Sequence, residues 1–275
     1  MSEVDLRLTD GRVLHGADDG PAAGDRALLW LHGTPGTGRL PVPLAAVAAD
    51  LGLRRFAFDR AGYGGSTPRP GRSPADTAAD AVALADHLGI GRFLLAGHSG
   101  GASHALALAA AHPDRVEAVL AVSALAPPAV LPGDAWFTGM GPAGTATLRA
   151  ALAGRAAREA HAGTDASDFT AADWAALEGE WGWLGEIAGE GSAHGPGPLV
   201  DDDLAYVGDW GVDLTAVRAR VLLLHGADDL VAPLGHARRL AAVLPDADLR
   251  VVEGAGHVSV LTGAATALRD LAAHR

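Results

Sequence analysis

The 275-residue sequence contains no cysteine and no lysine, and all 21 of its basic residues are arginine. Without cysteine, the chain forms no disulfide, performs no thiol catalysis and offers no thiolate to a metal. Without lysine, it forms no Schiff base with a substrate and has no P-loop lysine for a nucleotide phosphate. No uncharged apolar run reaches the length of about 18 residues that a membrane-spanning helix needs. The absences leave hydroxyl, imidazole and carboxylate chemistry.

The acidic residues outnumber the basic ones and give a net charge of -12, which disfavours binding to nucleic acid. The imbalance is local, because residues 159–217 hold 13 of the 33 acidic residues and no arginine. We therefore expect this segment to be a separate structural unit. We also expect its acidic side chains to form mostly a solvated face, and any that point inward to attract an ammonium group: Glu178, Glu180, Glu186, Glu190, Asp201, Asp202 and Asp203.

The first residues, MSEVDLR, include acidic side chains and lack the apolar run of a secretory signal. With 49% hydrophobic residues, the chain is able to bury one large core. We expect a cytoplasmic, globular protein of enzyme size. We expect it to be a monomer or a homodimer that acts on a small molecule.

Short apolar runs alternate with longer Ala/Leu-rich stretches, which is the pattern of a mostly parallel sheet with crossover helices. After an edge hairpin over residues 6–17, we predict strands over residues 26–31, 54–58, 93–96, 116–122, 221–224 and 249–252. We predict helices over residues 40–51, 74–88 (with Ser73 as N-cap), 100–111, 234–244 and 258–274. The alternation fails at residues 126–212, where five of the six tryptophans occur. We predict an α/β core domain of residues 1–126 and 213–275, with a mostly helical cap inserted at residues 127–212.

Ser99 lies in the pentapeptide Gly97-His98-Ser99-Gly100-Gly101, between a strand-like run and a helix-like stretch. A sharp strand-to-helix turn exposes a serine hydroxyl only if small residues stand two positions away on either side. Gly97 and Gly101 meet this requirement. The helix that follows would point N–H groups and its positive end at a developing oxyanion. We predict Ser99 as a nucleophile and the Gly100 N–H as one oxyanion donor.

A serine nucleophile needs a base, and twelve histidines compete for that role. His257 follows two glycines just past a predicted strand, where a loop is able to carry an imidazole over the carboxyl edge of the sheet. We predict His257 as the general base. His98 and His104 are expected to pack, and His32 to order its own loop by hydrogen bonds.

Five motifs stand in order between about residues 28 and 260: His32-Gly33-Thr34-Pro35-Gly36, Asp59-Arg60-Ala61-Gly62-Tyr63-Gly64-Gly65-Ser66, Gly97-His98-Ser99-Gly100-Gly101, His225-Gly226-Ala227-Asp228-Asp229-Leu230-Val231-Ala232-Pro233 and Gly254-Ala255-Gly256-His257. Together they resemble a capped serine hydrolase of the α/β-hydrolase superfamily, in its esterase and proline iminopeptidase-like branch. The resemblance implies an α/β-hydrolase fold, a mostly parallel central sheet with flanking helices.

The resemblance also implies a catalytic triad in the chain order Ser99, Asp229, His257. The family pattern places the acid three residues beyond the glycine of His-Gly, with a proline four residues later. Asp229 meets both spacings, and Asp228 is the alternative. The second oxyanion N–H falls on Thr34 by the same resemblance, because the next residue is a proline without an N–H. This chemistry needs no metal and no organic cofactor.

Two further features have structural interpretations. The glycine-rich stretch after Asp59 and Arg60 does not match a P-loop, so we predict a turn beside the active site with these two side chains as structural polar groups. The tryptophans of the insertion are expected mostly to build a core of its own. One or two of them should form a wall for an uncharged substrate, with Trp136, Trp181 and Trp183 as the candidates.

The sequence therefore favours hydrolysis of a small, largely uncharged carboxylic ester or lactone. One alternative is an aminopeptidase similar to the proline iminopeptidases, whose motifs His-Gly-Gly-Pro-Gly and Gly-Gly-Ser-Trp-Gly differ here at Thr34, His98 and Gly100. Another is a non-hydrolytic protein of the same fold, a small-molecule receptor or a secondary-metabolism cyclase.

Overall fold

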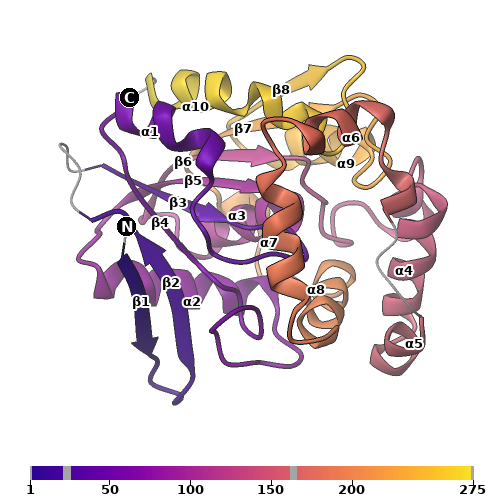
Figure 1. Ribbon diagram of the computed structural model, residues 1–275. Helices are drawn as coiled ribbons and strands as arrows, with labels where there is room; N and C mark the ends of the chain where they lie inside the picture. The colour runs from indigo at the N-terminus through magenta and orange to yellow at the C-terminus, as the bar shows by residue number, and fades with distance from the viewer. Residues whose placement is uncertain (1, 21–25, 162–165, 274–275) are drawn as a thin grey trace.

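The protein is described here by a computed structural model that covers residues 2–20, 26–161 and 166–273. An eight-stranded sheet lies at its centre in the order β1-β2-β4-β3-β5-β6-β7-β8 (Figure 1). The β1–β2 and β2–β4 pairs are antiparallel and the others are parallel, which confirms the predicted mostly parallel sheet. The strands are β1 Ser2–Arg7, β2 Val13–Asp18, β3 Ala27–Leu31, β4 Arg54–Phe58, β5 Phe93–His98, β6 Val116–Val122, β7 Arg220–Gly226 and β8 Ala247–Val252.

Helices cover both faces of this sheet because its central strands are apolar on both sides. Leu29 and Leu31 of β3 pack in one cluster with α2 and α3, while Leu28 and Trp30 pack in another with α1 and α10. The period of two along the strand thus divides the core into two layers. The helices are α1 Ala45–Asp50, α2 Pro74–His87, α3 Gly100–Ala111, α4 Pro142–Leu152, α5 Arg155–Ala160, α6 Ala171–Glu178, α7 Trp183–Ser192, α8 Gly197–Val207, α9 Leu234–Val243 and α10 Ala264–Ala273.

Helix boundaries follow the capping and proline chemistry of the sequence. Ser73 is the N-cap of α2, as predicted, and forms a capping box with Asp76. The single helix predicted over residues 40–51 is instead a 3-10 turn, Val42–Leu44, followed by α1. The backbone of Pro41 is extended, with a ψ of 116°, so helical backbone begins only after it. The last predicted helix begins with a 3-10 turn at Ser259–Gly263, and its predicted end at His274 lies outside the described residues.

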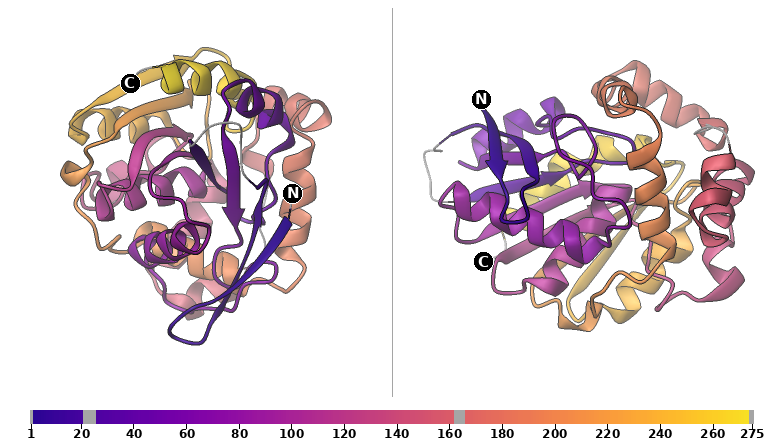
Figure 2. Two further views of the ribbon diagram at one scale, coloured as in Figure 1. Left: turned by 90° about the vertical axis from the view of Figure 1, so that its left-hand side faces the viewer. Right: turned by 90° about the horizontal axis from the view of Figure 1, so that it is seen from below.

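Helices α4 to α8 all lie within residues 127–212 and stand together beside the carboxyl ends of the central strands (Figure 1). We call residues 127–212 the inserted segment. Figure 2 shows the same helices on one side of the sheet when the molecule is seen from below. Within the described ranges, no helix combines the length and the apolar character needed to cross a bilayer.

Most tryptophans of the inserted segment do not build a core of its own, contrary to expectation. Trp183 packs edge-on against Trp30 of β3, with ring centroids 6.3 Å apart, and Trp181 joins the same cluster. Trp210 belongs to the cluster on the opposite face. Trp136 belongs to a third, smaller cluster, which is formed mainly by residues of the inserted segment itself. The inserted segment therefore shares its apolar core with the sheet, because its largest side chains are inserted into the sheet's layers.

The expectation of a solvated acidic face is also wrong for three residues. Asp201, Asp202 and Asp203 in α8 are 0–6% exposed, whereas Glu178 and Glu186 are exposed as expected. The aspartates are buried because arginines meet them: Arg60, Arg72, Arg155 and Arg158. A buried carboxylate needs such partners, since an isolated charge loses its hydration without compensation.

Asp173 anchors the inserted segment to the loop after β8. This fully buried carboxylate caps α6 together with Thr170. It also accepts the backbone N–H groups of His257 (3.2 Å), Val258 (2.8 Å) and Ser259 (2.8 Å), and the Ser259 hydroxyl (2.9 Å). A single side chain therefore satisfies donors from two distant parts of the chain.

The turn from β5 to α3 is tightly packed around Ser99. Ser99 adopts the positive φ of 57°, which is uncommon for a residue with a side chain. A Cβ on Gly101 would lie 2.0 Å from the Leu31 carbonyl oxygen, and one on Gly97 would lie 2.5 Å from the Gly101 carbonyl oxygen. The glycines therefore allow β5 and α3 to approach each other and the end of β3 closely.

Gly101→Ala should lower the free energy of unfolding by about 2 kcal/mol or more, because the added methyl group meets backbone that has little room to move. Urea denaturation measures the change. Gly91→Ala is the matched control, since nothing lies within 4 Å of a Cβ built there, and it should stay within about 0.5 kcal/mol. Equal stability of the two variants would contradict the packing argument.

Asp173→Ala should destabilise the protein by about 3 kcal/mol or more, because several buried N–H donors lose their acceptor at once. Glu178→Gln, at an exposed carboxylate of the same helix, should change stability by less than about 0.5 kcal/mol. The same denaturation measurement compares both variants. A loss at Asp173 no larger than that at Glu178 would show that the anchor contributes nothing.

Candidate active site

Ser99, His257 and Asp229 form one chain of hydrogen bonds. Ser99 Oγ lies 2.9 Å from His257 Nε2, and His257 Nδ1 lies 2.9 Å from Asp229 Oδ2. Because a carboxylate only accepts, His257 Nδ1 carries the proton and Nε2 is the acceptor that faces the serine hydroxyl. The structure thus brings together the three residues predicted for a triad, in the order that general-base activation of a serine requires.

The loop after β7 holds Asp229, the carboxylate of this hydrogen-bonded series, in place. Asp229 is buried, and its Oδ1 accepts the N–H groups of Val231 (2.9 Å) and Ala232 (2.8 Å). Burial opposes its ionisation, but the charge and hydrogen bonds of His257 lower the pKa of Asp229 to about 2. The alternative, Asp228, is exposed. Of the two adjacent aspartates, the one with the family spacing is the one at the imidazole.

Two side chains from the ends of β5 and β6 hold the backbone of His257. His98 Nε2 lies 2.8 Å from the His257 carbonyl oxygen, and Ser123 Oγ donates to the same oxygen at 3.4 Å. Burial and the neighbouring His257 lower the pKa of His98 to about 3, so this ring is neutral. His98 does more than pack, because it fixes the loop that carries His257.

The loop after β3 faces the N-terminus of α3 across Ser99. Gly33, Thr34 and Pro35 border the same cavity as Ser99 and Gly100, so the two predicted oxyanion donors, Thr34 and Gly100, lie at one cavity. His32 lies behind the loop, where Nδ1 donates to the Gly33 carbonyl (2.7 Å) and Nε2 accepts the Arg60 N–H (3.1 Å). Burial and the charge of Arg60 hold the pKa of His32 well below its ordinary value, and both bonds require that neutral ring.

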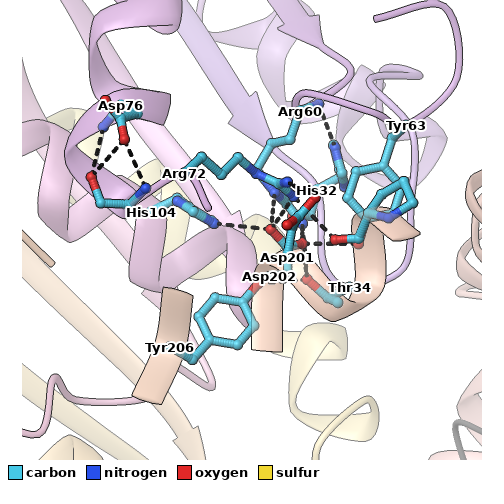
Figure 3. A network of polar contacts seen from close by, with 12 residues as sticks. His32, Thr34, Arg60, Tyr63, Arg72, Asp76, His104, Asp201, Asp202 and Tyr206 are labelled. Atoms are coloured by element: carbon cyan, nitrogen blue, oxygen red, sulfur yellow. Dashed lines mark hydrogen bonds and ion pairs between the residues drawn. The ribbon is translucent and has the colours of Figure 1, made fainter. Parts of the chain in front are cut away.

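Asp202 of α8 is the centre of a buried polar network behind this loop (Figure 3). Its carboxylate accepts hydrogen bonds from Arg60 (2.6 Å), Arg72 (2.6 Å), Thr34 (2.6 Å) and Tyr63 (3.0 Å). Burial alone would raise the pKa of Asp202, but the charges of Arg60 and Arg72 hold it well below its ordinary value. Asp202 is therefore ionised and its lone pairs are occupied.

Arg60 joins this network to the loop backbone. Its guanidinium donates to the carbonyl oxygens of His32 and Gly33 and to Thr34 Oγ1 (2.9 Å). Tyr206 of α8 adds a bond between its hydroxyl and Thr34 Oγ1 at 2.5 Å. Arg60 is thus a structural polar group beside the site, as predicted. The part that the inserted segment plays in this loop was not predicted.

The cavity at Ser99 has a volume of about 470 Å³ and mostly apolar walls. Helix α7 contributes Leu184, Ile187 and Ala188, which recur at helical spacing on one face. Among the described residues, two carboxylates also border the cavity, and both are engaged. Asp168 accepts the Gly144 N–H (2.7 Å), and Asp203 pairs with Arg158 (2.6 Å). Burial raises the pKa of Asp203 to about 6 against the opposing charge of Arg158.

The three tryptophans proposed for the substrate wall occupy other places. Trp136 donates its indole N–H to the Ala126 carbonyl (2.8 Å), while Trp181 and Trp183 are buried in the cluster that contains Trp30. The apolar wall is made instead by smaller side chains, among them Leu125, Leu148, Phe169, Leu177, Leu184, Ile187, Val231 and Val258. The helical spacing of the apolar residues between positions 184 and 188 is the sequence signal from which the α7 part of this wall could have been predicted.

Among the residues that the structure describes, no three His, Asp or Glu side chains are grouped so as to hold a metal ion.

Known proteins resemble this chain over most of its length. Its sequence is 29% identical to a protein of Caulobacter sp. (strain K31) named provisionally as the carbamate hydrolase RutD, over 91% of this chain and 90% of that one. It is 32% identical to a non-heme chloroperoxidase of Streptomyces lividans, over 75% of each. Its fold superposes on an esterase from Exiguobacterium antarcticum with a TM-score of 0.73 at 17% identity, over 98% of this chain and 99% of that one. The model of the alpha/beta hydrolase fold family matches residues 26–264, and the chain belongs to that family.

Proposed function

We propose that the protein is a serine hydrolase that cleaves a small, uncharged carboxylic ester or lactone. The observation that carries this proposal is the hydrogen-bonded series Ser99, His257 and Asp229 at the wall of a mostly apolar cavity. A cavity of this size and lining suits a small apolar acyl group. Membership of a hydrolase family supports the reaction class.

The proposed reaction uses the groups already described. His257 Nε2 takes the proton of Ser99 as Oγ attacks the substrate carbonyl carbon, and the Thr34 and Gly100 N–H groups stabilise the oxyanion. Collapse of the tetrahedral intermediate breaks the carbon–oxygen bond to the alcohol, which receives the proton from His257. Water then attacks the acyl-enzyme and gives a proton to His257. Collapse of this second tetrahedral intermediate breaks the bond between the acyl carbon and Ser99 Oγ, which takes the proton back from His257 as the carboxylic acid is released. Asp229 stabilises the imidazolium throughout.

The engaged carboxylates favour an uncharged substrate over an ammonium-bearing one. Asp203 is already paired with Arg158, and Asp168 already accepts backbone N–H groups of α4. Neither offers a free charge to a peptide amino end, as the aminopeptidase alternative requires. An alkoxide also leaves more easily than an amine, which favours an ester over an amide.

A carbamate is the second candidate substrate class, because the relative from Caulobacter sp. (strain K31), which matches 91% of this chain, is named provisionally as a carbamate hydrolase. A carbamate presents the same carbonyl carbon to Ser99 as an ester does. Turnover of a matched p-nitrophenyl ester and N-alkyl carbamate separates the two classes.

A fluorophosphonate probe should label the wild-type protein at Ser99, and Ser99→Ala and His257→Ala should abolish labelling. Turnover of p-nitrophenyl acetate should fall by about 10⁴-fold or more in both variants, because nucleophile and base act as a unit. His87→Ala, at an exposed histidine of α2, is the matched control and should retain both activities. A folded wild-type protein that neither labels nor turns over would favour the receptor or cyclase alternative.

An N-acetyl amino-acid ester should be hydrolysed with a kcat/KM about tenfold higher than the same ester with a free amino group, because the two carboxylates that border the cavity among the described residues are already engaged. Steady-state kinetics at pH 7 measures the ratio. The opposite preference would support the aminopeptidase alternative.

A further inference from the structure

The Tyr206 hydroxyl occupies the space that a side chain on Gly100 would fill. A Cβ built on Gly100 lies 1.8 Å from Tyr206 Oη and 2.7 Å from Thr34 Oγ1. Gly100 is the residue after the nucleophile, and Tyr206 comes from α8 of the inserted segment. The inserted segment therefore reaches the residue whose N–H is a proposed oxyanion donor.

The same hydroxyl bonds the other side of the proposed oxyanion site. Tyr206 Oη lies 2.5 Å from Thr34 Oγ1, which also donates to Asp202 (2.6 Å) and accepts from Arg60 (2.9 Å). A threonine hydroxyl has one proton, and Thr34 donates it in the hydrogen bond to the ionised carboxylate of Asp202. Tyr206 must therefore be the donor to Thr34. Burial raises the pKa of Tyr206, which keeps that proton in place.

We propose that Tyr206 is a positioning residue for the two oxyanion amides. It fixes Thr34 by a hydrogen bond and lies against Gly100, so both N–H groups are held toward one point. This role rests on the proposed serine hydrolase function. Oxyanion stabilisation depends on donors that are placed before the reaction begins, and a displacement of about 1 Å costs about 10²-fold in rate.

Tyr63 provides a matched control within the same network. It is buried like Tyr206, and its hydroxyl donates to the same carboxylate, Asp202, at 3.0 Å (Figure 3). Within the part of the chain that the structure describes, the Tyr63 hydroxyl forms no hydrogen bond with Thr34 and is not among the atoms nearest to a Cβ built on Gly100. Each Tyr→Phe change removes one buried hydroxyl, so a general loss of network stability should be similar in the two variants.

The test compares Tyr206→Phe with Tyr63→Phe in the full chain, using p-nitrophenyl acetate and a boronic acid that forms a tetrahedral adduct with serine. Tyr206→Phe should lower kcat about tenfold or more with KM within twofold, and should weaken boronate inhibition by a similar factor, because transition-state binding is lost. Tyr63→Phe should shift the melting temperature but keep kcat and boronate inhibition. Equal kinetic effects of the two changes would overturn the role of Tyr206.

Thr34→Val keeps the claim testable if Tyr206→Phe folds poorly, since it removes the same bond from the loop side. It should reproduce the loss of kcat, and the losses in the double variant should not add. Additive losses would overturn the proposal. A wild-type protein without hydrolysis and without fluorophosphonate labelling would instead overturn the proposed function itself, and with it this role.

Discussion

The ionised carboxylate of Asp202, buried between Arg60 and Arg72, is the interaction on which the arrangement of the site depends. A buried ion pair contributes little net stability compared with apolar packing, but an unpaired buried charge is costly. The partners of Asp202 come from the loop after β3, the turn after β4 and the segment before α2. Asp202 therefore joins α8 of the inserted segment to three segments of the core at one point.

Asp173 acts in the same way at the opposite side of the site. It ties α6 to the backbone of the loop that carries His257, while Asp202 ties α8 to the loop that carries Thr34. The two carboxylates thus join the inserted segment to both loops that flank Ser99. The acidic excess of residues 159–217 in the sequence includes both of these aspartates. Asp202 pairs with arginines of the core, Arg60 and Arg72.

The sequence predicted the sheet, Ser73 as a helix cap, and Ser99 and His257 at the site, because local glycine, proline and apolar patterns encode strand ends and tight turns. Asp229 came from the spacing that the family resemblance implies, with Asp228 as the alternative. It did not predict the burial of Asp201, Asp202 and Asp203. Three consecutive acids are typical of a solvated surface. The Arg60 and Arg72 partners of Asp202 lie 142 and 130 residues away in the sequence. The position of Trp183 was missed for the same reason, since its neighbour Trp30 belongs to the distant strand β3.

The two attachments lie on α6 and α8, which also contribute Leu177 and Tyr206 to the cavity wall, and neither attachment lies on α7. Helices α6 and α8 hold the inserted segment through Asp173 and Asp202, whereas α7 lines the cavity with residues such as Leu184 and Ala188. Side chains on the cavity face of α7 are therefore free to vary in size without disturbing either attachment. This separation makes α7 the natural place for evolution or protein engineering to alter substrate range while the reacting groups stay unchanged.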